Sequence, residues 1–520
     1  MASPSKNAKD TEAASGVRLE SVLPTDGTAW YKRGHLLKLN FIIVSLVLFS
    51  SANGFDGSVQ NSLQVLDQWE DFMKHPAGAW LGWINAIYWV GCFIGYPLGA
   101  WFSNRFGRKA GIYAGYLPLA IGVAVQVSAQ NDIAFMMARL FLGLASALFG
   151  NGAPLLINEI AYPAHRAIAN AAFMSGWYVG GSIAAWATFG TRDYASSWAW
   201  RVPCILQLLL PACALPGLLM SPESPRWLVS NDRFEEARAI LEEHHNGNSS
   251  ENSALVEFEY LEITTAIAAE KEAQNSSSYM DMLRTPGNRR RLFISISLGI
   301  FSQWAGNGVI SYYLTLILDT VGVTSVTDQT LISAFLQVWN LICAVAAAFV
   351  VDRLGRRTLF LASGIIMLVS YVIVMGLSAS FSETGHAATG TAVIPFLFVF
   401  FFGYDIALTP FLTAYPCEIW PFALRARGLT VTWAAGILAI FFNTFVNPIA
   451  LEDIAWKYYI VFIVVLVTMI ITVYFYYPET RRRTLEEIAV IFDGEAAELP
   501  MMTKEAKIVD PELEHEEGNQ

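Results

Sequence analysis

The sequence predicts an all-α membrane protein with twelve transmembrane helices arranged as two six-helix repeats. Two observations support this fold class: the composition and an internal repeat. Of the 520 residues, 54% are hydrophobic and 15% are charged, whereas ordinary soluble domains carry roughly 25% charged residues. Apolar runs of about 20 residues, the length that a helix needs to cross a bilayer, recur along the chain. Lipid is therefore the expected surrounding of most of this chain.

The internal repeat is centred on a short basic loop. The segment 104–109 (Asn-Arg-Phe-Gly-Arg-Lys) returns as 352–357 (Asp-Arg-Leu-Gly-Arg-Arg). Three further matches follow in the same order and at nearly the same offset: Glu159 with Arg166 and Glu418 with Arg425, 199–201 and 455–457, and 222–224 and 478–480. Parallel repeats of this kind are typical of transporters built from two helical halves.

The predicted membrane spans alternate with short polar loops. They cover 39–55, 80–102, 110–129, 132–155, 168–190 and 202–221, then 292–318, 329–350, 358–379, 391–415, 428–449 and 458–477. An even number of crossings puts both termini on one side. With that side taken as cytoplasmic, 28 of the 33 Lys and Arg residues lie inside, and the exceptions are Lys74, Arg139, Arg192, Arg201 and Lys457. The positive-inside rule therefore favours cytoplasmic termini.

The repeat divides the chain into five parts. These are an N-terminal tail (1–38), a first six-helix bundle (39–221), a linker (222–291), a second six-helix bundle (292–477) and a C-terminal tail (478–520). The linker is polar and acidic, and 234–244 and 255–270 have the spacing of amphipathic helices. We expect both tails and the linker in the cytoplasm, with short linker helices lying against the membrane domain.

Missing patterns argue against several functional classes. The net charge of −11 comes largely from acids in the tails and the linker, so it does not indicate a nucleic-acid partner. The five cysteines have no paired spacing and predict neither a disulfide framework nor a metal site. No nucleophile with a base, metal-ligand spacing or phosphate-binding loop indicates an enzyme. The tail 1–38 has no apolar core, so we expect no cleavable signal.

Charged residues within the spans are the first functional candidates, because a charge at the bilayer centre costs on the order of 3 kcal/mol. Asp56 lies at the outer end of the first predicted span and Arg139 early in the fourth. One interpretation makes Asp56 a proton carrier, since burial favours a neutral carboxyl group and a nearby guanidinium favours a charged one. The alternatives are a static pair or an Asp56 in extracellular water. Asp405, in the tenth predicted span, is a rival for proton coupling.

Amides and aromatic rings in the seventh predicted span indicate a site for a hydroxyl-rich substrate. Gln303, Trp304 and Asn307 lie in a run that also contains Gly306 and Gly308. Amides donate and accept hydrogen bonds as sugar hydroxyls do, and an aromatic ring suits the apolar face of a pyranose. Alternatively, the amides only join helices. Further candidates in other spans are Trp177, Thr413 and Asn443.

Charged residues at the predicted cytoplasmic ends of the helices form a candidate gate. Acids at one helix end that meet arginines of the next loop can bias two packings which differ by a few kcal/mol. The alternative is that the basic residues only set the topology. The predicted network is Arg105, Arg108, Glu159, Arg166, Glu223, Arg226, Asp352, Arg353, Arg356, Glu418, Arg425 and Glu479.

Together, the segments 104–109, 222–227, 303–308, 352–357 and 478–481 resemble the sugar porter branch of the major facilitator superfamily, over roughly 36–492. The segments 53–58 and 303–308 are most similar to fungal lactose permeases and to cellodextrin and hexose transporters. The resemblance implies a sugar site between the halves, with Asp56 and Arg139 at the positions that couple protons in symporters.

Four positions depart from the sugar porter pattern. Met174 and Ser302 stand where the family commonly has glutamines, and Thr413 stands where it has a tryptophan in the tenth helix. The asparagine of the seventh helix is displaced to Asn307. The selectivity of the family for monosaccharides therefore does not carry over.

These observations predict a monomeric importer of a mono- or disaccharide in a fungal plasma membrane, which works by rocking of the two halves around one site. The expected coupling ion is the proton, with no cofactor, and the expected partners are the sugar and the lipid bilayer. Three alternatives remain: a passive facilitator, a sugar sensor that binds without transporting, and an exporter of a small metabolite.

Overall fold

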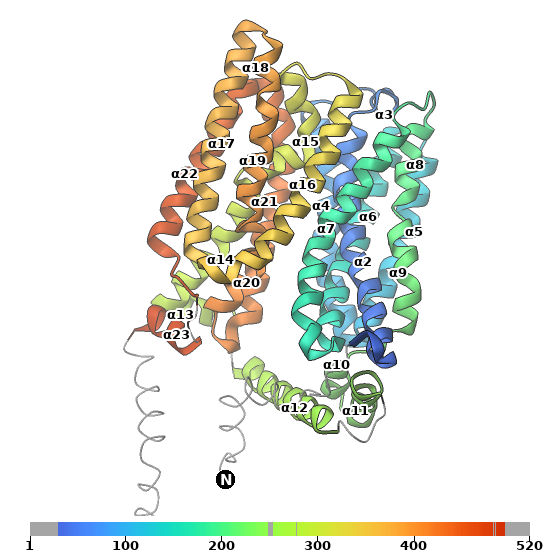
Figure 1. The fold of residues 1–520 in the computed structure, drawn as a ribbon, viewed down its shortest axis with the longest axis vertical. Helices are drawn as coiled ribbons and strands as arrows, with labels where there is room; N and C mark the ends of the chain where they lie inside the picture. The colour runs from blue at the N-terminus through green and yellow to red at the C-terminus, as the bar shows by residue number, and fades with distance from the viewer. Residues whose placement is uncertain (1–29, 248–252, 277, 482, 484, 495–520) are drawn as a thin grey trace, which may run out of the picture.

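The computed structural model describes residues 30–494 except 248–252, 277, 482 and 484, and within this range it leaves out the side chains of 253, 273–276, 348–353, 422, 485 and 486. The described part is helical and contains no strand. Of the predicted tails 1–38 and 478–520, the parts 1–29 and 495–520 lie outside the described residues, and the described parts contain the start of α2 and the helix α23. Two bundles stand side by side, one from each half of the chain (Figure 1).

Each bundle contains six membrane-crossing helices, some of them in two pieces. The first bundle consists of α2 (Gly34–Leu63), α4 (Gly78–Phe106), α5 (Arg108–Ser128), α6 (Asp132–Ile160), α7 (Arg166–Thr191) and α8 (Trp198–Leu206) with α9 (Leu209–Met220). The second consists of α14 (Pro286–Trp304) with α15 (Asn307–Thr320), α16 (Val326–Leu354), α17 (Arg356–Thr384), α19 (Val393–Asp405) with α20 (Leu408–Ile419), α21 (Phe422–Ile454) and α22 (Tyr459–Tyr476).

Hydropathy alone finds ten segments of the described chain that are long and apolar enough to cross a membrane. One of them, Ala423–Tyr476, spans both α21 and α22. The remaining helix, α7, does not reach the threshold, since it carries Asn170, Ser175 and Ser182 among its glycines. The twelve-helix prediction is confirmed, and α7 shows that a helix buried against its neighbours can cross the membrane with a polar composition.

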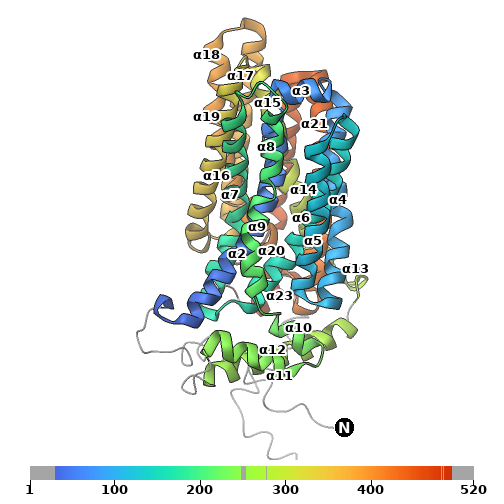
Figure 2. The same ribbon diagram turned by 90° about the vertical axis from the view of Figure 1, so that its right-hand side faces the viewer.

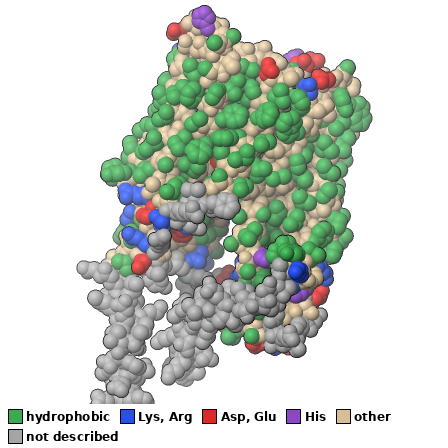
Figure 3. Space-filling model, in the orientation of Figure 1, with side chains coloured by type: hydrophobic (Ala, Val, Ile, Leu, Met, Phe, Trp, Pro, Cys, Tyr) green, Lys and Arg blue, Asp and Glu red, His purple; other side chains and the backbone are tan. Residues whose placement is uncertain are grey.

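The surface has the pattern of a membrane protein. Hydrophobic side chains cover the middle of the face shown in Figure 3 over both bundles, and charged side chains gather toward its two ends. An apolar band of this kind faces lipid, while polar ends lie in the headgroups and water.

The linker helices lie at one end of the bundles. They are α10 (Pro225–Ser230), α11 (Phe234–Leu241), a π-helical turn η3 (Glu242–Asn246), α12 (Ser253–Ser276) and α13 (Asp281–Arg284). Two perpendicular views place α10, α11 and α12 below the bundles (Figures 1 and 2). We call this the linker end and the opposite side the far end. The two helices predicted within the linker correspond to α11 with η3 and to α12.

Smaller elements complete the described chain. Beside the linker end lie η1 (Trp30–Lys32), η2 (Pro163–His165) and α23 (Leu485–Asp493), and toward the far end lie α3 (Asp67–Met73), α18 (Ala387–Thr391) and η5 (Ala455–Tyr458).

The two bundles touch at the far end and diverge toward the linker end (Figure 1). Ring contacts join α4 to α21, with the ring centroids of Trp83 and Phe445 6.3 Å apart. The hydrogen bonds at the far end are Gln64 Nε2 to Tyr312 O (3.0 Å), Leu314 N to Asn61 Oδ1 (3.1 Å) and Arg192 Nε to Thr327 Oγ1 (3.2 Å). No hydrogen bond or ion pair between described side chains joins the linker-end halves of the two bundles. Among the described residues, these contacts hold the two bundles together at the far end.

The first helix corrects one expectation from the sequence. Its predicted span ends at residue 55, which put Asp56 at the helix end, but α2 continues to Leu63. The segment 53–64 is polar and lowers the hydropathy there. It remains helical because other helices cover it, and Asp56 is only 4% exposed. The alternative that places Asp56 in extracellular water is therefore wrong for this conformation.

Candidate functional site

Two helices of the second bundle are broken in the middle of the membrane. Between α14 and α15, Gly306 has φ 106°, and an added Cβ would meet the ring of Tyr371. Two tyrosines bind the backbone at this break: Tyr371 donates to Gly306 O (2.7 Å) and Tyr404 to Ser302 O (2.9 Å). Between α19 and α20, Ala407 leaves the helical conformation. Broken helices put backbone ends and short polar side chains at membrane depth, where transporters place their sites.

The predicted amides lie around the first of these breaks. Asn443 donates from Nδ2 to Gln303 O (2.8 Å), and it lies against Gly308. The Gln303 side chain is half-buried and donates weakly to Ser302 Oγ (3.3 Å). Asn307, the first residue of α15, is 8% exposed, and its Oδ1 has no partner in the protein. The structure thus brings Gln303, Asn307 and Asn443 together at one place.

The aromatic candidates have clear packing roles. Trp304 donates from Nε1 to Ala439 O (3.0 Å) and packs on Phe442 at 5.3 Å, so it holds α14 against α21. Trp177 lies against Gly54 and Gly57, where an added Cβ would collide with it. These contacts explain both tryptophans without a substrate, although they leave their predicted role in binding untested.

Thr413 lies in α20, half-buried, and makes no hydrogen bond with a described residue. Its predicted contact with substrate stays a prediction.

Asp56 and Arg139 are neighbours that make no direct contact. Arg139 donates from Nε to Ile84 O (2.9 Å) and from Nη1 to Gln60 Oε1 (3.0 Å), and it lies over the ring of Tyr88. Gln60 is one turn after Asp56 on the same face of α2. Arg139 is therefore held one turn along α2 from the carboxyl group, whose Oδ1 has no hydrogen-bond partner. Within the described chain no ion pair joins the two, and the proton-coupling role stays a prediction.

Several buried polar atoms without a protein partner lie on helices that contact the other bundle. Buried polar groups in proteins are nearly always hydrogen-bonded, to protein or to ordered water. A cluster of unpartnered atoms therefore marks where water or a polar ligand binds. Among the described residues these atoms include Asn53 Oδ1, Asp56 Oδ1, Gln60 Nε2 and Gln64 Oε1 on α2, Asn85 Nδ2 on α4, Asn307 Oδ1 on α15, Asn340 Oδ1 on α16, Asp405 Oδ2 on α19 and Asn447 Nδ2 on α21.

The contact between Tyr178 and Asp405, which joins the two bundles, was not predicted from the sequence. Tyr178 of α7 donates to Asp405 Oδ1 at 2.5 Å, and its hydroxyl lies 3.2 Å from Thr409 Oγ1. Asp405 and Thr409 are visible in the sequence as polar residues in a span, but a tyrosine next to Trp177 looks like an ordinary packing aromatic. Only the approach of α7 to the second bundle identifies Tyr178.

The linker end of the first bundle carries an ordered charge cluster. Arg108, at the start of α5, contacts both carboxylate oxygens of Glu159, at 2.9 and 3.1 Å. Glu223 accepts from the backbone N–H groups of Arg108 (2.9 Å) and Lys109 (3.3 Å). An acid that caps a helix N-terminus stabilises the free N–H groups and the helix dipole. Burial raises the pKa of Glu223, against the opposing effect of these hydrogen bonds.

The second bundle repeats the backbone anchor of this cluster with a different side-chain ion pair. Glu479 accepts from the backbone N–H groups of Arg356 (2.8 Å) and Arg357 (3.1 Å). Arg356 donates from Nε (3.2 Å) and Nη2 (3.0 Å) to one oxygen of Glu418, and Thr480 donates to the other oxygen at 2.5 Å.

The remaining predicted gate residues behave differently. Arg166 approaches Glu259 of the linker at 3.9 Å rather than a bundle acid. Arg105 and Arg226 form no ion pair with a described residue, whereas Arg425 has an interaction partner within the chain. The side chains of Asp352 and Arg353 lie outside the described residues. The clusters thus tie helices within each bundle in this conformation.

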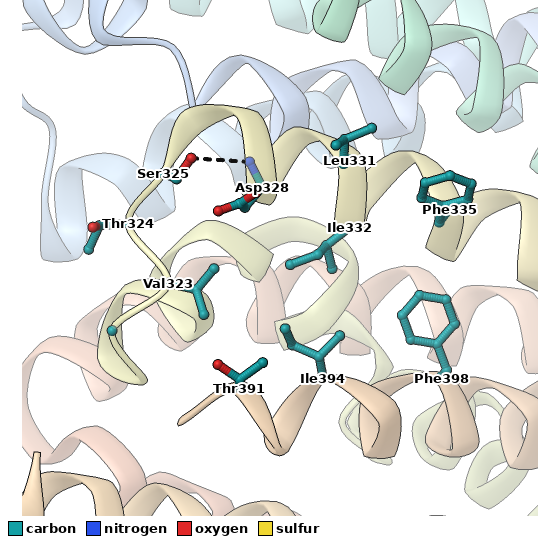
Figure 4. A pocket seen from close by; sticks show the side chains of 11 residues that line it. Val323, Thr324, Ser325, Asp328, Leu331, Ile332, Phe335, Thr391, Ile394 and Phe398 are labelled. Carbon is teal, nitrogen blue, oxygen red and sulfur yellow. Dashed lines mark hydrogen bonds between the residues drawn. The ribbon is translucent and has the colours of Figure 1, made fainter. Parts of the chain in front are cut away.

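A separate pocket lies at the far end, between the loop before α16 and the start of α19 (Figure 4). It has a volume of about 500 Å³, and Leu331, Ile332, Ile394 and Phe398 give it a largely apolar wall. None of the predicted site residues lines it. Within the described chain, no group of three or more His, Cys, Asp or Glu side chains is placed to hold a metal ion.

The chain matches the family model described as "Sugar (and other) transporter" over residues 42–492. Similar proteins include the high-affinity glucose transporter of Kluyveromyces lactis, which is 28% identical over 483 residues, covering 89% of this chain and 86% of that protein. The sugar transporter STL1 of Saccharomyces cerevisiae is 28% identical over 478 residues, covering 89% and 82%.

Solved structures show the same fold. The inward-open conformation of the xylose transporter XylE from E. coli aligns with a TM-score of 0.71 at 22% identity, covering 87% of this chain and 100% of that one. XylE described as a proton:xylose symporter and bound to 6-bromo-6-deoxy-D-glucose aligns with a TM-score of 0.68 at 21% identity, covering 87% and 99%. At this identity the likeness establishes the architecture alone. Since the family model covers most of the chain and the relatives match over most of their length, the protein belongs to the sugar transporter family of the major facilitator superfamily and is a multi-pass membrane transporter, not an enzyme.

Proposed function

We propose that this protein imports a sugar across a fungal plasma membrane by proton symport, with alternating access to one site between the bundles. Relatives named as glucose and sugar transporters support the substrate class, and a structural neighbour named as a proton:xylose symporter supports the coupling. The main observation is a set of buried amide and carboxyl groups on the helices that contact the other bundle. Each of these groups has an oxygen or nitrogen atom without a hydrogen-bond partner in the protein. A sugar, with its many hydroxyl groups, can satisfy donors and acceptors at once.

Gln303, Asn307 and Asn443 are the proposed sugar ligands, with Trp304, Trp177 and Thr413 as the wall around them. The three amides lie at the break between α14 and α15. The glycines beside them let the side chains approach the backbone closely. The protein acts as a monomer in this proposal and needs no cofactor besides the proton.

Asp56 is the proposed proton carrier, with Arg139 as the group that responds to its charge. Arg139 is bound to Gln60, one turn from Asp56, so a charged Asp56 can draw the guanidinium away from Gln60. Such a shift would change how α6 packs on α2, which links proton binding to the movement of helices.

The linker end is the proposed cytoplasmic side, since the described chain begins and ends there and most basic residues lie there. The far-end contacts then make this an inward-facing conformation. Glycosylation at the sequons 248–250 or 275–277 of the linker would contradict the orientation.

Transport in liposomes tests the coupling directly. With one proton per sugar, an inward gradient of one pH unit supports up to about tenfold accumulation, because one unit corresponds to about 1.4 kcal/mol. We expect uphill uptake that an uncoupler abolishes, and its loss in Asp56→Asn with sugar exchange retained. Asp67→Asn, an exposed acid at the far end, is the matched control. Uptake that only equilibrates and ignores the uncoupler would favour a passive facilitator. Binding without any counterflow would favour a sensor.

The sugar itself is identified by competition. A panel of mono- and disaccharides is tested against one labelled sugar in the same liposomes. Asn307→Ala is expected to weaken binding of the best competitor by about 1–3 kcal/mol, because the sugar hydroxyl loses its partner while remaining desolvated.

A further inference from the structure

A second buried acid lies where the two bundles meet in the middle of the membrane. Asp405, the last residue of α19, is 0% exposed. Its Oδ1 accepts a hydrogen bond from Tyr178 of the other bundle (2.5 Å) and one from Thr409 (3.0 Å). Its Oδ2 is buried without a partner. The carboxyl group therefore joins the bundles through one oxygen and leaves the other free.

No positive charge among the described residues accompanies this carboxyl group. No ion pair joins it to them, and the titratable groups that face it are Tyr178 of α7, Tyr404 beside it and Cys343 of α16. On α7, α14, α15, α16, α17 and α21, which pack around α19 and α20, the Lys, Arg, Asp and Glu residues lie within the first or last two turns. α18 has none, and α23 lies at the linker end. Among the described residues of these helices and of α19 with α20, which cross the membrane as one broken helix, Asp405 is the only acid away from the ends of a membrane-crossing helix.

Asp56 provides the contrast. Asp56 is buried to a similar degree, but Gln60, one turn along α2, binds Arg139 of α6. A charged Asp56 therefore has a positive charge nearby. An ionised carboxylate without a counter-charge costs many kcal/mol in an apolar interior, and such groups become neutral instead. Burial without a counter-charge therefore favours a protonated carboxyl group at Asp405, against the opposing effect of the two hydroxyl groups that donate to its Oδ1.

Separation of Tyr178 from Asp405 would change the protonation of the Asp405 carboxyl group. Asp405 directly precedes the break before α20, so its carboxyl group lies near the N-terminal end of a 12-residue helix. The helix N-terminus favours negative charge once water reaches the group. Separation of Tyr178 from Asp405 would thus allow the proton on Oδ2 to pass to water, leaving a carboxylate and a hydronium ion.

We propose that Asp405 is a positioning residue for bundle closure: the bundles close on Tyr178 only when Asp405 is protonated, and the proton exchanges only after this contact opens. The inference rests on the proposed transport function but differs from the role of Asp56. The Asp405 proton stays on the protein through the inward-facing state, where the group is fully buried. It therefore controls the rate of the conformational change from the outside and adds no proton to the stoichiometry.

Sugar counterflow separates this role from proton coupling, because exchange of labelled for unlabelled sugar moves no net charge. The experiment uses Asp56→Asn liposomes, in which the coupling acid is already neutral, and varies external and internal pH independently. We expect exchange to slow as external pH rises, tenfold per unit beyond the titration point, since only the protonated fraction can close. Changing the internal pH should have no effect.

Three variants in the same background complete the test. Asp405→Asn mimics the protonated group and should remove the dependence on external pH. Tyr178→Phe removes the cross-bundle hydrogen bond but keeps the buried acid, so the dependence should persist. Ser363→Ala, another buried polar residue of the second bundle, is the matched control for packing.

Two results would overturn the inference. The first is a rate of sugar exchange in Asp56→Asn that does not depend on external pH, and this result requires no Asp405 variant. The second is an unchanged pH profile of exchange in a folded Asp56→Asn/Asp405→Asn double variant. Failure of the proposed symport looks different. The protein with Asp56 intact would then equilibrate sugar without accumulating it, while the dependence of exchange on external pH would remain.

Discussion

The linker ends of the two bundles have the same backbone anchor and different side-chain ion pairs. In both, a glycine with positive φ starts a helix, Gly107 (104°) and Gly355 (91°), and one glutamate accepts from the next two backbone N–H groups. In the first bundle Arg108 contacts both oxygens of Glu159, whereas in the second bundle Arg356 contacts one oxygen of Glu418 and Thr480 takes the other.

This difference separates what the repeat must keep from what it can vary. The glutamate anchor fixes the turn between two helices, so both copies need it. The ion pair between an arginine and a glutamate holds a neighbouring helix in place. In the second bundle, an arginine and a threonine both bind this glutamate. We expect the turn to be equally sensitive in both bundles and the ion pair to be more sensitive in the first.

The largest expected effect comes from the two glycines. Only glycine adopts φ near 100° with ψ near 155° without backbone strain. An added Cβ would also collide with the anchoring carboxylate. Gly107→Ala and Gly355→Ala should each cost about 3 kcal/mol or more, from backbone strain and steric overlap together. The loss is measured as a fall in the thermal unfolding midpoint of the purified transporter.

Each bundle offers its own control for this experiment. Gly190 and Gly376 have open space around the position of an added Cβ. Alanine is favoured over glycine within a helix, so Gly190→Ala and Gly376→Ala should not lower the midpoint. A fall in one bundle alone would break the equivalence of the two turns.

The anchoring glutamates should give intermediate effects of similar size. Glu223→Gln and Glu479→Gln each keep one acceptor oxygen and lose the second together with the charge, which should cost about 1–2 kcal/mol. Denaturation by guanidinium in detergent measures it. A Glu479→Gln protein as stable as the unsubstituted one would show that the second anchor is geometric only.

The ion pairs should distinguish the bundles. Lysine cannot make the two parallel hydrogen bonds of a guanidinium. Arg108→Lys should therefore cost about 1 kcal/mol and Arg356→Lys less, since Thr480 still binds Glu418. Arg105→Lys, an exposed residue without an ion pair in the described chain, serves as the control for the same thermal measurement. Equal losses at Arg108 and Arg356 would remove the proposed asymmetry.

A final expected effect is a pH dependence at His244, which lies in the linker turn η3 that packs against α2 of the first bundle. Burial lowers the pKa of His244 from 6.5 to about 4. Between these two pKa values, His244 is protonated in the unfolded chain and neutral in the folded one. The free energy of unfolding therefore falls as the pH drops from about 6.5 toward 4. His244→Gln should lose less stability than the unsubstituted protein between about pH 7 and pH 5. The exposed His386→Gln is the control, and a parallel decline in all three proteins would contradict the assignment.

The repeat and the apolar runs already predict the twelve crossings, the linker helices and the pairing of basic loops with acids, since these depend on local composition and on motifs that recur. The helix ends were harder. The predicted first span stops at residue 55 because the polar segment that follows lowers hydropathy, although α2 continues for two more turns. α7 is too polar to meet a hydropathy threshold and still spans the membrane among its neighbours.

By itself, the sequence determined that lipid surrounds this chain, that one six-helix unit occurs twice, and which residue types could bind a sugar or a proton. Tertiary structure alone decided that Arg139 bonds to Gln60 rather than to Asp56, and that Tyr178 reaches Asp405 across the bundles. The reason is physical. A membrane span is specified by its own apolar length, whereas a hydrogen bond between bundles depends on the rotation and depth of two helices that are far apart in the chain.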